Sequence, residues 1–136
     1  AMEQANLTPI YCVGETLAEF EAGETKTVVG SQVREGLANL TSEQVRDLVV
    51  AYEPVWSIGT GKNASSAIAE DICGFIRSIL RDMFGDVADE IRILYGGSVK
   101  PENVKEYLSL PNVDGALVGG ASLKIDSYEK LLTNIL

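Results

Sequence analysis

Histidine is missing from the sequence altogether. Its absence excludes histidine-based acid/base catalysis, Ser-His-Asp triads and histidine-containing metal sites within these 136 residues. Only two cysteines, Cys12 and Cys73, are present, and they form no CxxC motif. Because both lie in apolar stretches, we expect buried, reduced thiols and a cytoplasmic protein.

Basic residues are scarce: 11 of them stand against 20 acidic residues, which gives a net charge of −9. This balance argues against nucleic acid or an anionic membrane as the main partner. No apolar run approaches the roughly 20 residues of a membrane span, and residues 1–4 do not begin a signal peptide. The length and the 46% hydrophobic content predict one globular domain over residues 1–136.

Short apolar runs alternate with longer segments of helical periodicity. Four runs are predicted as strands, over residues 9–13, 48–52, 91–95 and 114–118. The first is almost continuously apolar, which is typical of a parallel strand buried on both faces. Because strands separated by helices are parallel and have right-handed crossovers, the sequence predicts an α/β fold of four βα units.

Particular residues mark the expected ends of helices. Thr41 begins a capping-box sequence before a short helix. Ser65 is expected to cap a long helix that ends at Gly85. Pro101 is expected in the first turn of the next helix, and Asp126 as the cap of the last one.

The third and fourth predicted strands both end in a Gly-Gly pair, within residues 96–98 and 119–121. Backbone without Cβ lets a ligand approach closely, and the N-terminus of a following helix attracts phosphate. In βα barrels the loops after the seventh and eighth strands often build such a site. The alternative is that the glycines only serve tight turns, but two consecutive strand ends with one pattern favour phosphate binding.

Glu53 stands directly at the end of the second predicted strand, where Pro54 favours an extended conformation. A carboxylate fixed there could act as a general base, although position alone favours a solvated carboxylate. The loop that follows, residues 54–62, contains the apolar Trp56 and Ile58. They would be buried either by closure of the loop as a lid over a ligand or by permanent packing on the domain.

Nucleotide-binding motifs fit this loop poorly. Trp56 and Asn63 stand where a P-loop needs glycine and a hydroxyl residue. Gly59, Gly61 and Ala64 do match G-x-G-x-x-G/A, but they follow a long loop rather than a tight strand-to-helix turn. A dinucleotide site is therefore disfavoured.

The segment 51–62, Ala-Tyr-Glu-Pro-Val-Trp-Ser-Ile-Gly-Thr-Gly-Lys, closely resembles the triosephosphate isomerase family. Residues 12–15, 95–99 and 117–123 continue the likeness in the order and spacing of the family. The resemblance covers the chain from about Leu7 onward. It implies the TIM (β/α)8-barrel fold, here as the last four βα units, a half-barrel.

The resemblance also implies an isomerase of glycolysis and gluconeogenesis that interconverts dihydroxyacetone phosphate and glyceraldehyde 3-phosphate without cofactor or metal. Glu53 is similar to the family's general base. Ser98 and the backbone of Gly59, Gly119 and Gly120 are similar to its donors for the substrate phosphate. The lid of the family corresponds here to Pro54, Val55, Trp56, Ser57, Ile58, Thr60, Gly61 and Lys62.

Some family features have no counterpart here. The Asn-Lys pair of the first strand, the electrophilic His of the fourth strand and the dimer loop of the third unit are absent. Ser57 replaces the expected Ala in the lid, and Cys73 stands where many members have His. Because Glu53 has no partner to stabilise enediolate charge, we expect this chain alone to be inactive.

Three functional classes therefore remain open. The first is a triose-phosphate isomerase, a homodimer in its full-length form, of which this chain is half. The second is a non-catalytic half-barrel that pairs with itself, or with a missing N-terminal half, and keeps some phosphate affinity. The third is another phosphate-binding βα enzyme, which the match around Glu53 disfavours.

Overall fold

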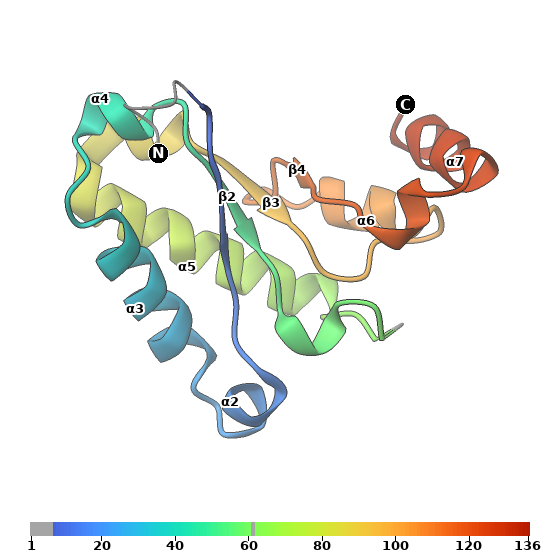
Figure 1. The fold of residues 1–136 in the computed structure, drawn as a ribbon, viewed down its shortest axis with the longest axis horizontal. Coiled ribbons are helices and arrows are strands. Elements are labelled where there is room, and N and C mark those ends of the chain that lie inside the picture. The colour runs from blue at the N-terminus through green and yellow to red at the C-terminus, as the bar shows by residue number, and fades with distance from the viewer. Residues whose placement is uncertain (1–6, 61) are drawn as a thin grey trace.

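A parallel sheet of four strands lies at the centre of the computed structural model, which describes residues 7–60 and 62–136 (Figure 1). Its strands follow one another in sequence order: β1 (Ile10–Val13), β2 (Val49–Tyr52), β3 (Arg92–Tyr95) and β4 (Gly115–Ala116). All three pairings are parallel. The predicted α/β fold of four consecutive βα units is therefore confirmed.

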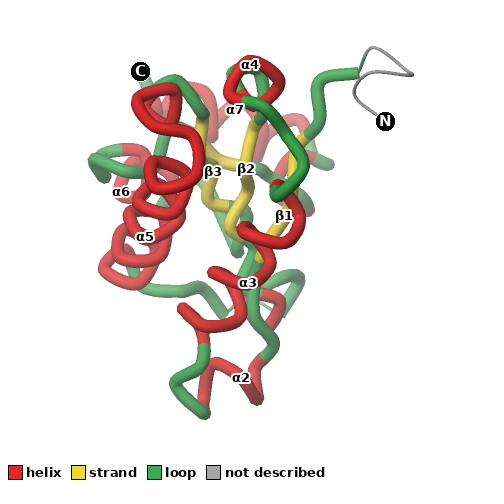
Figure 2. Tube along the Cα trace, turned by 90° about the vertical axis from the view of Figure 1, so that its left-hand side faces the viewer, coloured by secondary structure: helices red, strands yellow, loops and turns green. Residues whose placement is uncertain are grey.

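Helices make every connection between strands. Between β1 and β2 lie α2 (Leu17–Glu21), α3 (Thr25–Leu37) and α4 (Ser42–Val45). The remaining helices are α5 (Ser66–Phe84), α6 (Val104–Leu108) and α7 (Ile125–Ile135), with short 3₁₀ turns η1 (Val55–Ser57), η2 (Gly85–Asp89) and η3 (Gly120–Ser122). The long helix α5 lies beside β2 and β3 (Figure 2), and α3 packs against it. At the other edge of the sheet α6 contacts both α7 and β4 (Figure 1).

The sheet has one covered face and one open face. Tyr52 and Tyr95 are register partners on the covered face, and both are 0% exposed. On the opposite face Ile10 is 48% exposed and Cys12 is also exposed. The predicted burial of the first strand on both faces, and of Cys12, is therefore wrong, because within the described residues helices cover only one side of β1. Cys73 is buried as predicted, and burial raises the pKa of its thiol to about 12.

The fourth strand is shorter than the predicted range 114–118. The β3–β4 ladder stops at Tyr95, the last residue of β3. The next amide, that of Gly96, donates to the Tyr52 carbonyl of β2 at 2.8 Å. The Leu117 amide still donates to the Tyr95 carbonyl at 3.0 Å. No strand of the described chain lies on the other side of β4 to extend the pairing.

Three of the predicted helix boundaries are confirmed. The Thr41 hydroxyl accepts from the Gln44 amide at 3.3 Å in a capping box. The Ser65 hydroxyl caps α5 by accepting from the Ile68 amide at 3.3 Å. The helix α5 ends where Gly85 takes a φ of +73°, a conformation that glycine adopts without a steric penalty.

Two other predicted helix starts are wrong. Pro101 precedes α6 instead of lying in its first turn, because the Asn103 side chain holds the chain in a turn. The Asn103 Oδ1 accepts from the Lys100 amide at 2.7 Å, and the Asn103 Nδ2 donates to the Ser98 carbonyl at 3.2 Å. Asp126 does not cap α7 but lies inside its first turn, where its negative charge still suits the helix dipole.

Arg77 of α5 ties that helix to the starts of β3 and β4. Its guanidinium donates to the carbonyls of Ala88 and Ile91 at 2.9 and 3.1 Å. It also donates to the Asn112 side chain at 3.2 Å and to the Asp114 carboxylate at 2.6 Å. The Arg77 side chain is only 14% exposed, so these contacts replace most of its hydration.

We expect Asp114→Ala to lower the free energy of unfolding by about 2 kcal/mol, because it leaves a mostly buried guanidinium without its anion. Urea denaturation measures the change. Asp71→Ala is the matched control, since the pair of Asp71 with Lys26 is 60% and 51% exposed and is worth less than about 0.5 kcal/mol. Equal losses in the two variants would contradict the assignment.

Candidate active site

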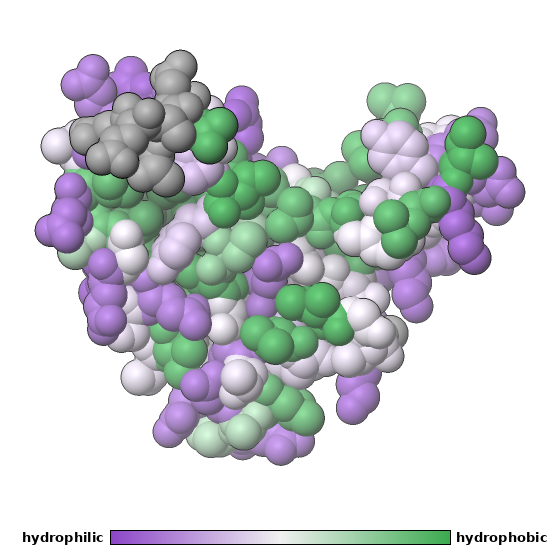
Figure 3. All heavy atoms as spheres, viewed as in Figure 1, coloured by the Kyte–Doolittle hydropathy of each residue, from purple (hydrophilic) through white to green (hydrophobic). Residues whose placement is uncertain are grey.

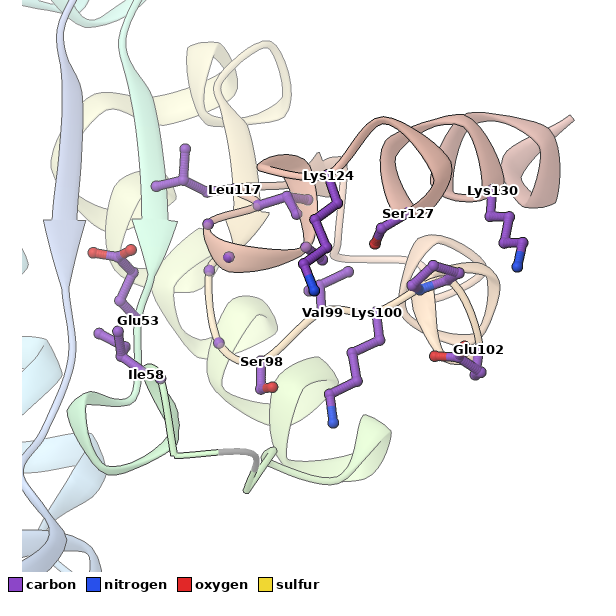
Figure 4. Close-up of a pocket in the computed structure, with 18 of the residues that line it drawn as sticks. Glu53, Ile58, Ser98, Val99, Lys100, Glu102, Leu117, Lys124, Ser127 and Lys130 are labelled. Carbon is purple, nitrogen blue, oxygen red and sulfur yellow. The ribbon is translucent and has the colours of Figure 1, made fainter.

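The carboxyl ends of β2, β3 and β4 open into one pocket with a volume of about 810 Å³ (Figure 4). Parallel strands of βα units end at the same edge of the sheet, so residues far apart in sequence meet there. The pocket is lined by all five residues that the sequence marked as catalytic or phosphate-binding: Glu53, Gly59, Ser98, Gly119 and Gly120.

Glu53 fits between two glycines from neighbouring strand ends. Its amide donates to the Val13 carbonyl at 2.7 Å, which continues the β1–β2 ladder. A Cβ on Gly14 would stand 1.8 Å from the Glu53 carbonyl oxygen, and one on Gly96 would stand 2.5 Å from the Glu53 Cγ. Partial desolvation and, secondarily, the nearby Glu53 carboxylate raise the pKa of the exposed Cys12 thiol. Neither glycine can be replaced without displacing Glu53.

Positive and negative side chains balance in the pocket, although the whole chain carries −9. Its lining includes three lysines and three carboxylates: Lys100, Lys124, Lys130, Glu53, Glu102 and Asp126. None of the three lysines forms an ion pair within the described parts of the chain. Figure 4 shows Lys100 and Lys124 on the Ser98 side, across the pocket from Glu53. An anionic group is therefore best accommodated on the side away from Glu53.

The backbone at the end of β4 is open to a ligand, whereas the glycines at the end of β3 pack against Glu53 and Tyr95. Nothing lies within 4 Å of the point where a Cβ of Gly119 or Gly120 would stand. Ser98 is held in place through its carbonyl, which accepts from Asn103 at 3.2 Å. Gly59 has a φ of +68°, and nothing lies within 4 Å of where its Cβ would stand. Its backbone therefore also faces the pocket without a side chain in front of it.

The loop after Glu53 is partly fixed and partly exposed. The Trp56 ring lies 4.6 Å from the Phe20 ring, so Trp56 packs on the domain, which was the second of the two alternatives. Ile58 is 48% exposed and borders the pocket. The other lid residues divide by burial: Pro54 and Ser57 are buried, Val55, Thr60 and Lys62 are exposed, and Gly61 lies outside the described residues.

Glu15 is a buried carboxylate to which sequence reasoning gave no role. It is 0% exposed and accepts from the Trp56 Nε1 at 3.1 Å, the Tyr52 hydroxyl at 3.1 Å and the Thr25 hydroxyl at 3.2 Å. Burial, with Glu15 beside it, raises the pKa of Tyr52. Glu15 thus joins the first part of the lid to β2 and α3. The sequence signals were its place after Gly14 at a strand end and its membership of the family-like segment 12–15.

Comparison with known proteins agrees with this arrangement. Residues 1–135 match the family model described as triosephosphate isomerase. The chain belongs to the triosephosphate isomerase family. The resemblance that the four motifs indicated is therefore confirmed, and with it the assignment of the four βα units to part of a TIM barrel.

Curated relatives named triosephosphate isomerase match nearly the whole chain. The relative from Moorella thermoacetica is 61% identical over 126 residues, which are 93% of this chain and 51% of the relative. The relative from Carboxydothermus hydrogenoformans is 58% identical over 127 residues, again 93% and 51%. That from Lactococcus lactis is 53% identical over 133 residues, 97% and 53%. The chain thus spans about half the length of these triosephosphate isomerases.

The described residues contain neither a helix that could span a membrane nor a cluster of side chains that could bind a metal ion. None of their helices combines the length and the hydrophobicity that a bilayer crossing requires. Nor do residues 7–60 and 62–136 bring three or more His, Cys, Asp or Glu side chains together in a group that could hold a metal ion.

Proposed function

We propose that this chain supplies the general base and the phosphate-binding strand ends of a triose-phosphate isomerase, within a longer protein. The substrates are dihydroxyacetone phosphate and glyceraldehyde 3-phosphate. One observation carries the proposal: Glu53 and the open backbone of Gly119 and Gly120 line the same pocket, with unpaired lysines on the side away from Glu53. A triose phosphate has the matching polarity, with an acidic C–H at one end and an anion at the other.

In this proposal Glu53 removes a proton from the carbon next to the substrate carbonyl and returns it to the neighbouring carbon. Ser98 and the backbone of Gly119 and Gly120 hold the phosphate, and Gly59 adds a contact from the lid. The lid includes residues 54–60 and Lys62. Its closure excludes water from the reacting carbons. No cofactor or metal takes part.

The reaction passes through an enediolate, whose charge needs donors near the reacting oxygens. The sequence contains no histidine for this task. The full-length protein, a homodimer, would supply those donors from its other half. We place it in the cytoplasm, because both cysteines are free thiols and disulfides are rare there.

A second candidate function is a non-catalytic half-barrel that keeps phosphate affinity and associates through its open surfaces. The observation that favours it is the open face of the sheet at Ile10 and Cys12. Both candidates require the pocket to bind an anion, and only the first requires proton transfer by Glu53.

A sulfate titration followed by amide NMR shifts tests the shared requirement. We expect shifts confined to residues 97–99 and 119–122, with a dissociation constant on the order of 1 mM, about −4 kcal/mol, since few groups close on the ligand. Ser98→Ala should weaken binding severalfold, because it removes one hydroxyl donor. Ser31→Ala on α3 is the matched control. Absence of shifts at both segments would count against the phosphate site.

A further inference from the structure

The two residues that directly follow the lid, Asn63 and Ala64, are held by a tyrosine from α6. The Tyr107 hydroxyl donates to the Ala64 carbonyl at 2.5 Å and accepts from the Asn63 Nδ2 at 2.7 Å. One hydroxyl therefore uses both its donor and an acceptor position on the two consecutive residues that follow the lid.

A second tyrosine completes the arrangement. The Tyr95 hydroxyl accepts from the Ala64 amide at 3.2 Å, and the Tyr95 and Tyr107 rings stack with centroids 4.3 Å apart. Ala64 is 0% exposed, and both its backbone polar groups bond to tyrosine hydroxyls, although the carbonyl also accepts from the Asn63 Nδ2 at 3.4 Å. The rings themselves are 0% and 1% exposed, which fixes the positions of the hydroxyls.

The two ends of the lid segment are thus anchored differently. At the first end Trp56 packs against Phe20 and donates to Glu15. At the second end the anchors are the two hydrogen bonds of Tyr107, which lies on α6, and the bond from the Ala64 amide to Tyr95. Between the two anchors Ile58 and Gly59 line the pocket without packing against the domain interior.

We propose that Tyr107 is a positioning residue that fixes the second end of the lid and so sets how readily the lid opens. The inference rests on the proposed function only in calling this segment a lid. Opening at this end breaks both hydrogen bonds of Tyr107. A tyrosine with a purely structural role in the core would keep its bonds when the lid opens.

Amide hydrogen exchange, followed by NMR on the 136-residue chain, tests this. Tyr107→Phe keeps the stacked ring but removes the hydroxyl, so we expect exchange at the Ala64 and Ile58 amides to accelerate about tenfold. Asn63→Ala removes one of the two bonds from the lid side, at an exposed residue whose loss the fold tolerates. It should accelerate the same amides about threefold and leave the core amides of β2 unchanged.

Tyr128→Phe is the matched control, because Tyr128 lies on α7, is 49% exposed and makes no lid contact. If Tyr107→Phe reduced protection of the β2 amides while exchange at Ala64 and Ile58 stayed at the wild-type rate, Tyr107 would be structural only and the proposal would fail. The readout needs no ligand. A wild-type chain that binds no sulfate would thus refute the phosphate site without affecting this result.

Discussion

In a coupled assay of glyceraldehyde 3-phosphate conversion, the 136-residue chain is expected to turn over at least about a thousandfold more slowly than its full-length relatives. Removing a single donor that stabilises a developing oxyanion typically costs 10²–10³ in rate. This chain has no histidine at all, and the pocket lysines lie on the side away from Glu53. The proposed base is present, but the negative charge that proton removal would create on the substrate has no partner.

The control for this assay is sulfate binding by the same sample, which separates an inactive but folded chain from a misfolded one. Glu53→Asp, which shortens the side chain by one carbon, should leave the low background rate unchanged. Turnover within tenfold of a full-length relative, abolished by Glu53→Asp, would refute the expectation. Addition of a separately produced N-terminal half of a relative should restore activity if the missing groups lie there.

The position of Glu53 was readable from sequence, but its importance was not. A carboxylate at a strand end followed by proline is equally compatible with a solvated side chain, and only the family motif favoured a base. The close fit of Glu53 between Gly14 and Gly96, where an added Cβ would stand 1.8 and 2.5 Å from Glu53 atoms, involves residues about 40 positions away in either direction. Local patterns do not encode such contacts.

The same limit explains the errors in burial. The apolar neighbours of Cys12 predicted a buried thiol, and alternation within β1 gave no indication otherwise. Whether a strand face is covered depends on elements that come from elsewhere in the fold. Glu15 and Tyr107 were missed for a related reason, because each acts through partners about 40 residues distant, Trp56 and Ala64.

Helix boundaries were predicted more accurately than burial where the capping interactions are local. Thr41, Ser65 and Gly85 were predicted correctly because a cap involves only residues three or four positions apart. The prediction that Pro101 lies in the first helical turn was wrong, because the Asn103 side chain accepts from the Lys100 amide and forms a turn there instead. The chemistry was local there too, but two local signals conflicted.

The surface offers two apolar regions to a partner. One is the open face of the sheet, where Ile10 is 48% exposed. The other is the outer side of α7 and the turn before it, where Leu123, Ile125 and Leu132 are 85%, 82% and 49% exposed. Figure 3 shows hydrophobic side chains across the middle of the molecule and again on the projecting end that carries α7. Exposed apolar surface of this extent is typical of association sites.

We therefore expect the chain to associate with a second copy of itself in sedimentation equilibrium at 0.15 M salt. Within the described residues β1 and β4 each have a neighbour on one side only, and unpaired strand edges promote pairing between chains. The net charge of −9 opposes association, but salt screens charges over about 8 Å, so it does not prevent contact between apolar faces. Ile10→Lys should shift the chain toward monomer by charging the open face, whereas Val55→Lys, equally exposed but on the lid, should not. A well-folded 14.6 kDa monomer that unfolds cooperatively would show that the open face needs no partner.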